Sequence, residues 1–235
     1  MPGPDFHTTR WSMVARAADV DPAIAHRALG ELCEQYWSAL YAFVRRNGRA
    51  EADALDLVQS FCAQLLDRGG LRGAARDAGK FRHYLLGALR HFLDNTARHE
   101  RAAKRGGGAL HWSLDDAEAC YAREPAEAGP ERVFERRWAA ALLDRALGRL
   151  RDEYHARGRH AVLAALEPAL LGDDAAARHQ DVAIRLGTSE GAVKVALHRL
   201  RARLRELIRD EVLQTVTEPA AVDDELRLLF AALSG

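Results

Sequence analysis

Residues 180–210 constrain the fold more than any other part of the chain, because they predict a short helix, a tight turn and a long second helix. Ala183 is a small residue at the point where two such helices cross closely. Gly187 follows four positions later and suits the positive φ with which a chain often leaves a helix. Thr188 or Ser189 can cap the second helix by accepting a hydrogen bond from a backbone N–H. This spacing is typical of a helix-turn-helix, whose second helix lies in the major groove of DNA.

The second helix of this motif has two different faces. Aliphatic residues spaced by three and four positions form a stripe that we expect to be buried: Val193, Leu197, Leu200, Leu204 and Leu207. Basic residues with the same spacing form another face, which further arginines widen: Lys194, His198, Arg201 and Arg205, with Arg199, Arg203 and Arg209. A solvated cationic face of an ordinary amphipathic helix would explain the arginines alone, but the adjacent turn favours DNA binding.

Composition indicates an all-α protein with one large domain or two modest ones. The 235 residues are 48% hydrophobic, which is enough for real cores, and runs of Val, Ile and Thr are short. The formal net charge is zero, but the charge is unevenly distributed. Residues 80–105 are basic, whereas residues 111–135 and 210–225 are acidic. Two basic blocks separated by acidic ones predict two surfaces that face DNA.

Several classes of protein are disfavoured by what the sequence lacks. Its three cysteines are far apart and none has a partner at zinc-ligand spacing, so we expect no metal, with Cys33 and Cys62 as buried thiols. There is no P-loop, no GxSxG motif and no cluster of metal ligands, which argues against an enzyme and against a cofactor. The sequence shows no signal peptide and no apolar run that could span a membrane, so we expect a cytoplasmic protein.

Apolar periodicity and helix-ending residues divide the rest of the chain into helical blocks. The predicted helices cover residues 22–46, 53–68, 80–105, 131–154 and 160–171, and a short one begins near Asp223. Residues 106–130 contain three consecutive glycines, acidic residues and two prolines, and they read as a flexible linker. The last helix would have Asp223 as its cap, and four apolar residues would line one face: Leu226, Leu229, Phe230 and Leu233. Docking of that face on residues 134–170 is the simpler interpretation, and a regulatory helix is the alternative.

Three of these segments, in this order, resemble the motifs of a bacterial RNA polymerase sigma factor of the extracytoplasmic-function (ECF) type, within the sigma-70 class. DALDLVQSF resembles the family's polymerase-clamp-binding helix, and KFRHYLLGALRHFLDNTARHERAAKR resembles the helix that opens and reads the −10 promoter element. TSEGAVKVALHRLRARLRELI resembles the helix that reads the −35 element. The resemblance implies a sigma region 2-like domain at 1–105, a linker at 106–130, a sigma region 4-like domain at 131–211 and a C-terminal extension at 212–235.

The resemblance also implies three groups of binding residues. Core polymerase would bind the second helix at Asp53, Asp56, Leu57, Gln59 and Phe61. The −10 element would contact the third helix at Tyr84, Arg90, His91, Asn95, Arg98 and Arg101, although core packing is the more ordinary role for Tyr84. The −35 element would contact Arg185, Ser189, Glu190, Ala192, Lys194, Val195, His198, Arg199 and Arg201. In a major groove Glu190 can accept a hydrogen bond from cytosine and Lys194 can donate one to guanine, whereas the arginines suit phosphates.

One departure from the family pattern concerns the polymerase-binding helix. Leu55 and Ser60 stand where the family often has acidic residues. Simple drift of the sequence is the favoured explanation of this difference; the alternative is that phosphorylation of Ser60 adds about two negative charges and strengthens docking.

The expected partners follow from the same resemblance. Two promoter elements about two helical turns apart lie roughly 70 Å from each other, and a flexible linker of about 25 residues has a typical span of only ~25–30 Å. A large partner must therefore hold the two domains apart, and in the family that partner is core RNA polymerase. Promoter DNA is the second partner, and an anti-sigma factor or another regulator is a further candidate. The alternative is a conventional helix-turn-helix regulator that binds duplex DNA without polymerase, which would leave the −10-like helix without a role.

Overall fold

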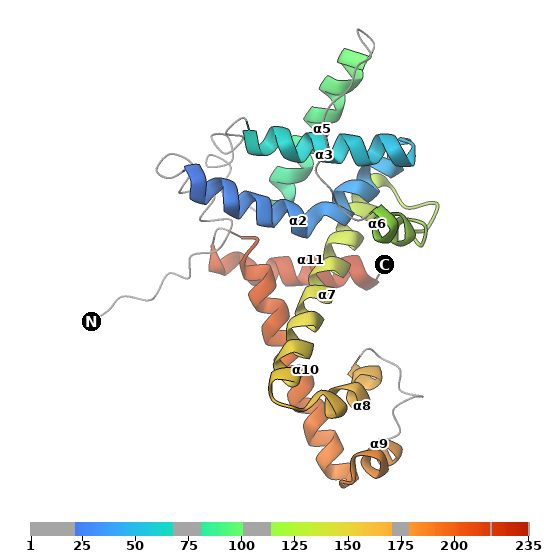
Figure 1. The fold of residues 1–235 in the computed structure, drawn as a ribbon, viewed down its shortest axis with the longest axis vertical. Helices are drawn as coiled ribbons and strands as arrows, with labels where there is room; N and C mark the ends of the chain where they lie inside the picture. Colours follow the sequence, from blue (N-terminus) through green and yellow to red (C-terminus); the bar gives the residue numbers. More distant parts are fainter. Residues whose placement is uncertain (1–21, 68–80, 101–113, 171–178, 217, 235) are drawn as a thin grey trace, which may run out of the picture. The chain divides into compact units, whose positions relative to one another are not determined.

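The computed structural model describes residues 22–67, 81–100, 114–170, 179–216 and 218–234, and α-helices make up most of them (Figure 1). The helices are α2 (Pro22–Arg46), α3 (Glu51–Asp67), α5 (Phe81–Glu100), α6 (Leu114–Tyr121), α7 (Pro130–Ala156), α8 (His160–Leu170), α9 (His179–Leu186), α10 (Glu190–Leu213) and α11 (Val222–Ser234), with a short 3₁₀ turn at Pro219–Ala221. No strand occurs in the described ranges, so the all-α prediction is confirmed there. None of these helices has both the length and the apolarity that a membrane span requires.

The chain forms two compact units. The first contains residues up to Ala141 together with those from Val212 onward, and the second contains Leu142–Glu211. Helices α7 and α10 therefore contribute to both units. The division expected after 211 coincides with a boundary of the second unit, whereas the one expected after 130 lies eleven residues before the boundary at Ala141, because the beginning of α7 packs with α2.

Aromatic side chains form the core of the first unit. The ring of Tyr36 on α2 lies 5.1 Å from that of Phe81 on α5 and 6.3 Å from that of Phe134 on α7, centroid to centroid. Phe43, two turns further along α2, packs edge-on against the same Phe134 ring at 6.4 Å. All four side chains are at most 2% exposed. Trp138 follows Phe134 by one turn and is also buried, so the start of α7 belongs to this core.

Part of the predicted flexible linker is ordered in the structure. Within 106–130, residues 114–121 form α6, and Glu118 on this helix accepts hydrogen bonds from the Arg45 guanidinium (2.7 and 3.0 Å) and from the Tyr41 hydroxyl. The Arg45 hydrogen bond lowers the pKa of Glu118, and that of Tyr41 adds to the effect. Glu124 is buried and lies 2.6 Å from the guanidinium of Arg137. Two of the acidic residues that made this segment look solvated, Glu118 and Glu124, are thus partners of arginines on α2 and α7. Residues 106–113 lie outside the described ranges.

The C-terminal helix α11 presents a different face from the one expected. Leu229 is buried as predicted, but Phe230 is 50% exposed and Leu233 is 40% exposed. Glu225 is fully buried instead, and it forms an ion pair with Arg82 of α5. The helix also begins at Val222, so Asp223 lies in its first turn and is not its cap. Burial of Glu225 places α11 on the first unit, which a hydrophobic pattern alone does not predict.

Candidate nucleic-acid interface

The turn between α9 and α10 has the geometry that the sequence predicted for a helix-turn-helix. Gly187 has a φ of +61°, and the backbone N–H of Thr188 donates to the carbonyl of Ala183 at 2.9 Å. The Ser189 hydroxyl accepts a hydrogen bond from the N–H of Ala192 at 3.2 Å, so Ser189 is the cap of α10. Ala183 is 5% exposed, as expected of a small residue at a close helix crossing.

Helix α10 has one buried and one exposed face, in the register expected from the sequence. The five aliphatic residues of the stripe are at most 8% exposed: Val193, Leu197, Leu200, Leu204 and Leu207. Every residue proposed for −35 contacts is exposed: Arg185, Ser189, Glu190, Ala192, Lys194, Val195, His198, Arg199 and Arg201. Val195 leaves 51% of its surface exposed, although it is a large apolar residue. The structure thus brings all nine residues onto the accessible side of α9 and α10.

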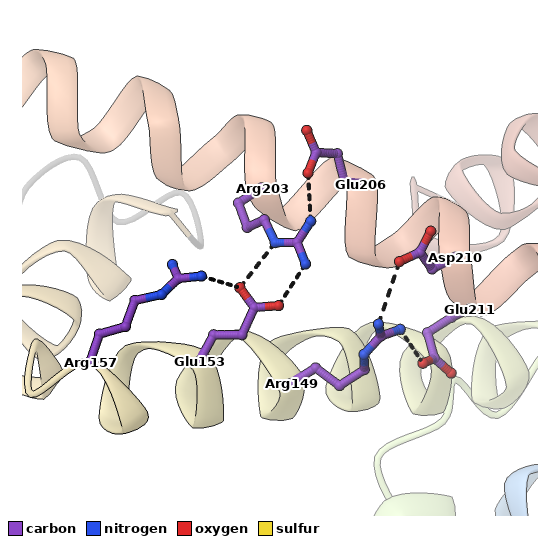
Figure 2. A network of polar contacts seen from close by, with 7 residues as sticks. All are labelled: Arg149, Glu153, Arg157, Arg203, Glu206, Asp210 and Glu211. Carbon is purple, nitrogen blue, oxygen red and sulfur yellow. Dashed lines mark hydrogen bonds and ion pairs between the residues drawn. The ribbon is translucent and has the colours of Figure 1, made fainter.

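The arginines of α10 differ in whether a carboxylate already binds them. Arg203 donates to Glu153 of α7 through Nε at 3.0 Å and Nη2 at 2.6 Å, and its Nη1 donates to Glu206 at 2.6 Å (Figure 2). These bonds raise the pKa of Arg203, and the Arg203 hydrogen bond lowers the pKa of Glu153. The expectation that Arg203 widens the basic surface is therefore not met, because its guanidinium joins α10 to α7.

A second set of ion pairs joins the same two helices, between Arg145 and Arg149 of α7 and the last acidic residues of α10. Arg149 lies 2.9 Å from Glu211 and 3.4 Å from Asp210 (Figure 2). Arg145 lies 3.1 Å from Glu211. Glu211 is buried. The acidic residues at the end of α10 therefore stabilise the packing of the helix, which leaves the basic side chains nearer its start to face solvent.

Three arginines in the helix-turn-helix remain available for phosphate. Within the described ranges no ion pair is found for Arg185, Arg199 or Arg205, and all three are exposed. Arg201 differs, since its Nη2 donates to the carbonyl of Ala169 on α8 at 3.0 Å. Arg201 thus supports the packing of α10 on α8 as well as lying on the accessible side.

The two residues with the clearest potential for reading bases contact each other. Lys194 Nζ lies 2.7 Å from Glu190 Oε1, one turn away on α10, and this contact lowers the pKa of Glu190. Both side chains are at least half exposed. Such a surface pair contributes little to stability, so it can separate when each group meets a base.

A cavity of about 430 Å³ lies beside these residues, in the second unit. Its apolar wall includes Val162 and Val195, and its basic groups are Arg159 and Arg199. The guanidinium of Arg159 lies over the ring of Tyr154, at a distance of 5.5 Å from the centroid. Sequence reasoning missed Arg159 because it lies in the turn between α7 and α8, where no helical period relates it to α10. Gly158, with its positive φ of 64°, was the only local signal of that turn.

The residues proposed for −10 contacts lie along α5, and two of them share a smaller cavity of about 250 Å³. Tyr84 and His91 line it together with Phe61 of α3 and Phe92 of α5. Burial raises the pKa of Tyr84 to about 12, so its hydroxyl stays protonated at neutral pH. Asn95 Nδ2 lies 3.2 Å from His91 Nδ1, at the exposed edge of the helix. Aromatic walls and an edge of hydrogen-bonding groups suit an unstacked base.

The basic residues of α5 have unequal access to DNA. Arg98 is exposed, and Arg101 lies outside the described ranges. Arg90 is half exposed, but its Nη2 lies 2.5 Å from Glu131 of α7 and its guanidinium lies 5.9 Å from the centroid of the Phe43 ring. The Arg90 hydrogen bond lowers the pKa of Glu131. A phosphate at Arg90 would therefore compete with Glu131 for the guanidinium.

The structure narrows the residues proposed for polymerase docking on α3. Asp53 and Asp56 are exposed, whereas Leu57, Gln59 and Phe61 are 7%, 8% and 3% exposed. The last three lie mostly inside the first unit, so Asp53 and Asp56 form the accessible part of the proposed docking surface, and the role of the other three stays a prediction. Leu57 and Phe61 face inward because they follow the apolar period of α3.

No family model, curated protein or solved structure matches the chain. The geometry of the helix-turn-helix, of α5 and of α3 therefore carries the functional argument.

Proposed function

We propose that this protein is a transcription initiation factor of the sigma-70 class that directs core RNA polymerase to specific promoters. The observation that carries the proposal is the helix-turn-helix, in which all nine candidate −35 residues are exposed while the aliphatic stripe of α10 is buried. In this proposal the protein acts in the cytoplasm, where polymerase and promoter DNA meet. It is not an enzyme, since polymerase carries out the chemistry.

Reading of the −35 element falls to the first turns of α10. Ala192 and Val195 offer apolar contacts, of the kind that recognise a thymine methyl group, and Glu190 and Lys194 offer an acceptor and a donor for base edges. Arg185 and Arg199 are placed to bind phosphates, which position the helix without specifying sequence. The Arg159 guanidinium joins Arg199 on the wall of the larger cavity and adds a second phosphate contact beside α10.

Reading and opening of the −10 element fall to α5. Tyr84 and His91 line a cavity of about 250 Å³, which is large enough to take one planar base. Asn95 lies at its edge, and Arg98 is exposed further along the helix, where the backbone of a separated strand would pass. The same surface binds duplex DNA poorly because an unstacked base is needed to enter the cavity.

Docking on polymerase falls to the exposed side of α3. Asp53 and Asp56 lie one turn apart and are both exposed, and Ser60 follows one turn later on the same side. Two carboxylates form a small acidic surface, so phosphorylation of Ser60 would about double its charge. A conventional helix-turn-helix regulator would need neither this surface nor the cavity on α5.

Transcription by purified bacterial core polymerase on a pool of random promoter fragments, with and without this protein, tests the proposal. Specific start sites that occur only with the protein, and a shared motif upstream of them, are expected. A protein with Asp53→Asn and Asp56→Asn should lose these starts while keeping duplex binding by α10. Arg227→Ala is the matched control, because Arg227 is exposed on α11 and pairs only with Asp224 among the described residues. Tight duplex binding without polymerase, together with no starts, would identify a conventional regulator instead.

A further inference from the structure

The C-terminal segment, residues 212–234, contacts the beginning of α5 in two ways. The backbone N–H of Phe81, the first residue of α5, donates to the carbonyl of Thr215 at 3.0 Å. One residue later, the Nε of Arg82 donates to Glu225 Oε1 of α11 at 2.6 Å. One contact is made by the backbone that follows α10 and the other by a side chain of α11. The first turn of α5 is therefore fixed both along its axis and in rotation.

The ion pair between Arg82 and Glu225 is buried, unlike most ion pairs in the described part of the chain. Arg82 is 3% exposed and Glu225 is fully buried. The guanidinium also lies 2.9 Å from Glu135 and 5.2 Å from the centroid of the Trp138 ring, both on α7. Glu135 keeps 45% of its surface exposed, so Glu225 is the carboxylate that neutralises Arg82 inside the unit. Removing one partner of a buried pair leaves the other charge without compensation, which is strongly unfavourable.

The same turn of α5 carries Tyr84, which lines the cavity proposed for a base. Phe81 packs against Tyr36 at 5.1 Å and against Tyr84 at 6.3 Å, centroid to centroid. A rotation of the first turn would therefore move Tyr84 relative to Phe61, which comes from α3 and forms the facing wall. A site whose walls come from two helices depends on the contacts that hold those helices in register.

We infer that the C-terminal segment is a positioning part of the strand-binding site on α5, acting through Thr215 and Glu225. It is neither a separate domain nor a spare helix, since its buried carboxylate neutralises the one buried guanidinium found among the described residues of α5. This inference rests on the proposed function for the identity of the ligand, but the contacts that it invokes are independent of that ligand. It extends the site to residues that lie 143 positions apart in the chain, Arg82 and Glu225.

The test compares three full-length variants with the wild-type protein. Glu225→Gln removes the buried charge and keeps the shape of the side chain, and Arg82→Gln with Glu225→Gln removes both charges together. Asp224→Asn is the matched control, because Asp224 is adjacent in sequence, exposed, and bound to Arg227 on the surface. Two fluorescein-labelled probes are titrated, a random-sequence single-stranded 20-mer and a random-sequence 30-base-pair duplex, at a temperature where each variant is fully folded. Hydrogen exchange of the backbone amides in α5 and α10 is measured in the absence of DNA.

For Glu225→Gln we expect single-strand binding to weaken about ten-fold while duplex binding changes less than two-fold. Amide exchange in the first turns of α5 should accelerate at least ten-fold, and exchange in α10 before residue 211 should not change. The double variant should recover most of both losses, because no unpaired charge remains buried. Asp224→Asn should behave as the wild type in every measurement.

Equal losses for both probes with Glu225→Gln would overturn the inference, since they would indicate general destabilisation. Unchanged exchange in α5 would overturn it too, because the segment would then have no influence on that helix. If the wild-type protein fails to bind the single strand at all, the proposed function of α5 fails, and the exchange data still decide whether the segment positions the helix.

Discussion

Glu153 provides a test of how carboxylates limit the basic surface of α10. Its side chain accepts two hydrogen bonds from Arg203, at 3.0 and 2.6 Å, and lies 4.0 Å from Arg157. Arg203 comes one turn after Arg199, which we assign to phosphate binding. Glu153→Gln should therefore have two opposite effects, a loss of stability and a gain in affinity for DNA.

The size of each effect follows from exposure and charge. The side chain of Arg203 is 38% exposed and that of Glu153 is 23% exposed, and a pair with this much solvent contributes at most about 1 kcal/mol to the free energy of unfolding. Gln keeps one acceptor for Arg203, so the expected loss is about 0.5–1 kcal/mol. The released guanidinium adds about one phosphate contact, which steepens the dependence of log K on log salt by roughly 0.9.

The assay is fluorescence anisotropy with a labelled duplex at salt concentrations between about 50 and 200 mM, with unfolding followed in urea. The affinity gain from Glu153→Gln should be about three-fold larger at the low end of this range than at the high end. Glu206→Gln is the matched control, because it removes the single bond at 2.6 Å and leaves both bonds to Glu153. Its salt dependence should stay close to that of the wild-type protein.

An unchanged salt dependence in folded Glu153→Gln protein would refute this reasoning, because Arg203 would then lie too far from DNA for its ion pair with Glu153 to affect binding. Weaker binding at all salt concentrations would refute it more strongly, since Glu153 would then support the interface instead of competing with it.

Three further predictions use other parts of the molecule. Gly187→Ala should lower the free energy of unfolding by about 1 kcal/mol; no atom obstructs the added methyl group, so the cost comes from the φ of +61° alone. Gly148→Ala, inside α7 and equally unobstructed, should raise the free energy of unfolding, and urea unfolding measures both. Arg201→Ala should lower stability as well as affinity, since Arg201 binds the carbonyl of Ala169, but Arg199→Ala should lower affinity alone; the two are separated by comparing unfolding with duplex binding. The Arg45 hydrogen bond lowers the pKa of Glu118 below its ordinary 4.5, so its stabilisation is present above that pH and is lost as the pH falls through the lower folded-state pKa; Glu118→Gln should flatten this acid dependence of thermal unfolding, and an unaltered profile would contradict the assignment.

Local signals in the sequence were sufficient to predict the helix-turn-helix. The glycine at position 187, the cap at Ser189 and the stripe from Val193 to Leu207 each depend on neighbours within a few residues, and all three are confirmed. Helix ends were predicted for the same reason, since Pro22 begins α2 and Gly48, with a φ of +84°, follows its end. These features could be predicted because each is recognisable from residues close together in the sequence.

Long-range ion pairs account for what the sequence did not predict. Arg203 and Glu153 are 50 positions apart, and Arg45 and Glu118 are 73 positions apart, so no local pattern connects them. Charged residues of this kind look solvated in a sequence, which contributed to the prediction of a linker at 106–130 and of Arg203 as part of the basic face. The burial of Glu225 also depends on a distant partner, so the buried face of α11 differs from the apolar stripe expected from the sequence.

The central claim, that α10 directs polymerase to promoters by reading DNA, is tested most directly by mapping start sites with a reader variant. Wild-type protein, Lys194→Ala with His198→Ala, and Arg205→Ala are each combined with core polymerase and the same pool of random promoters. The variant with Lys194→Ala and His198→Ala should start at promoters with a changed or relaxed −35 motif and an unchanged −10 motif. Arg205→Ala should use the wild-type motifs with lower yield at high salt. Identical −35 motifs for all three proteins would contradict the account, because α10 would then not be the element that reads the promoter.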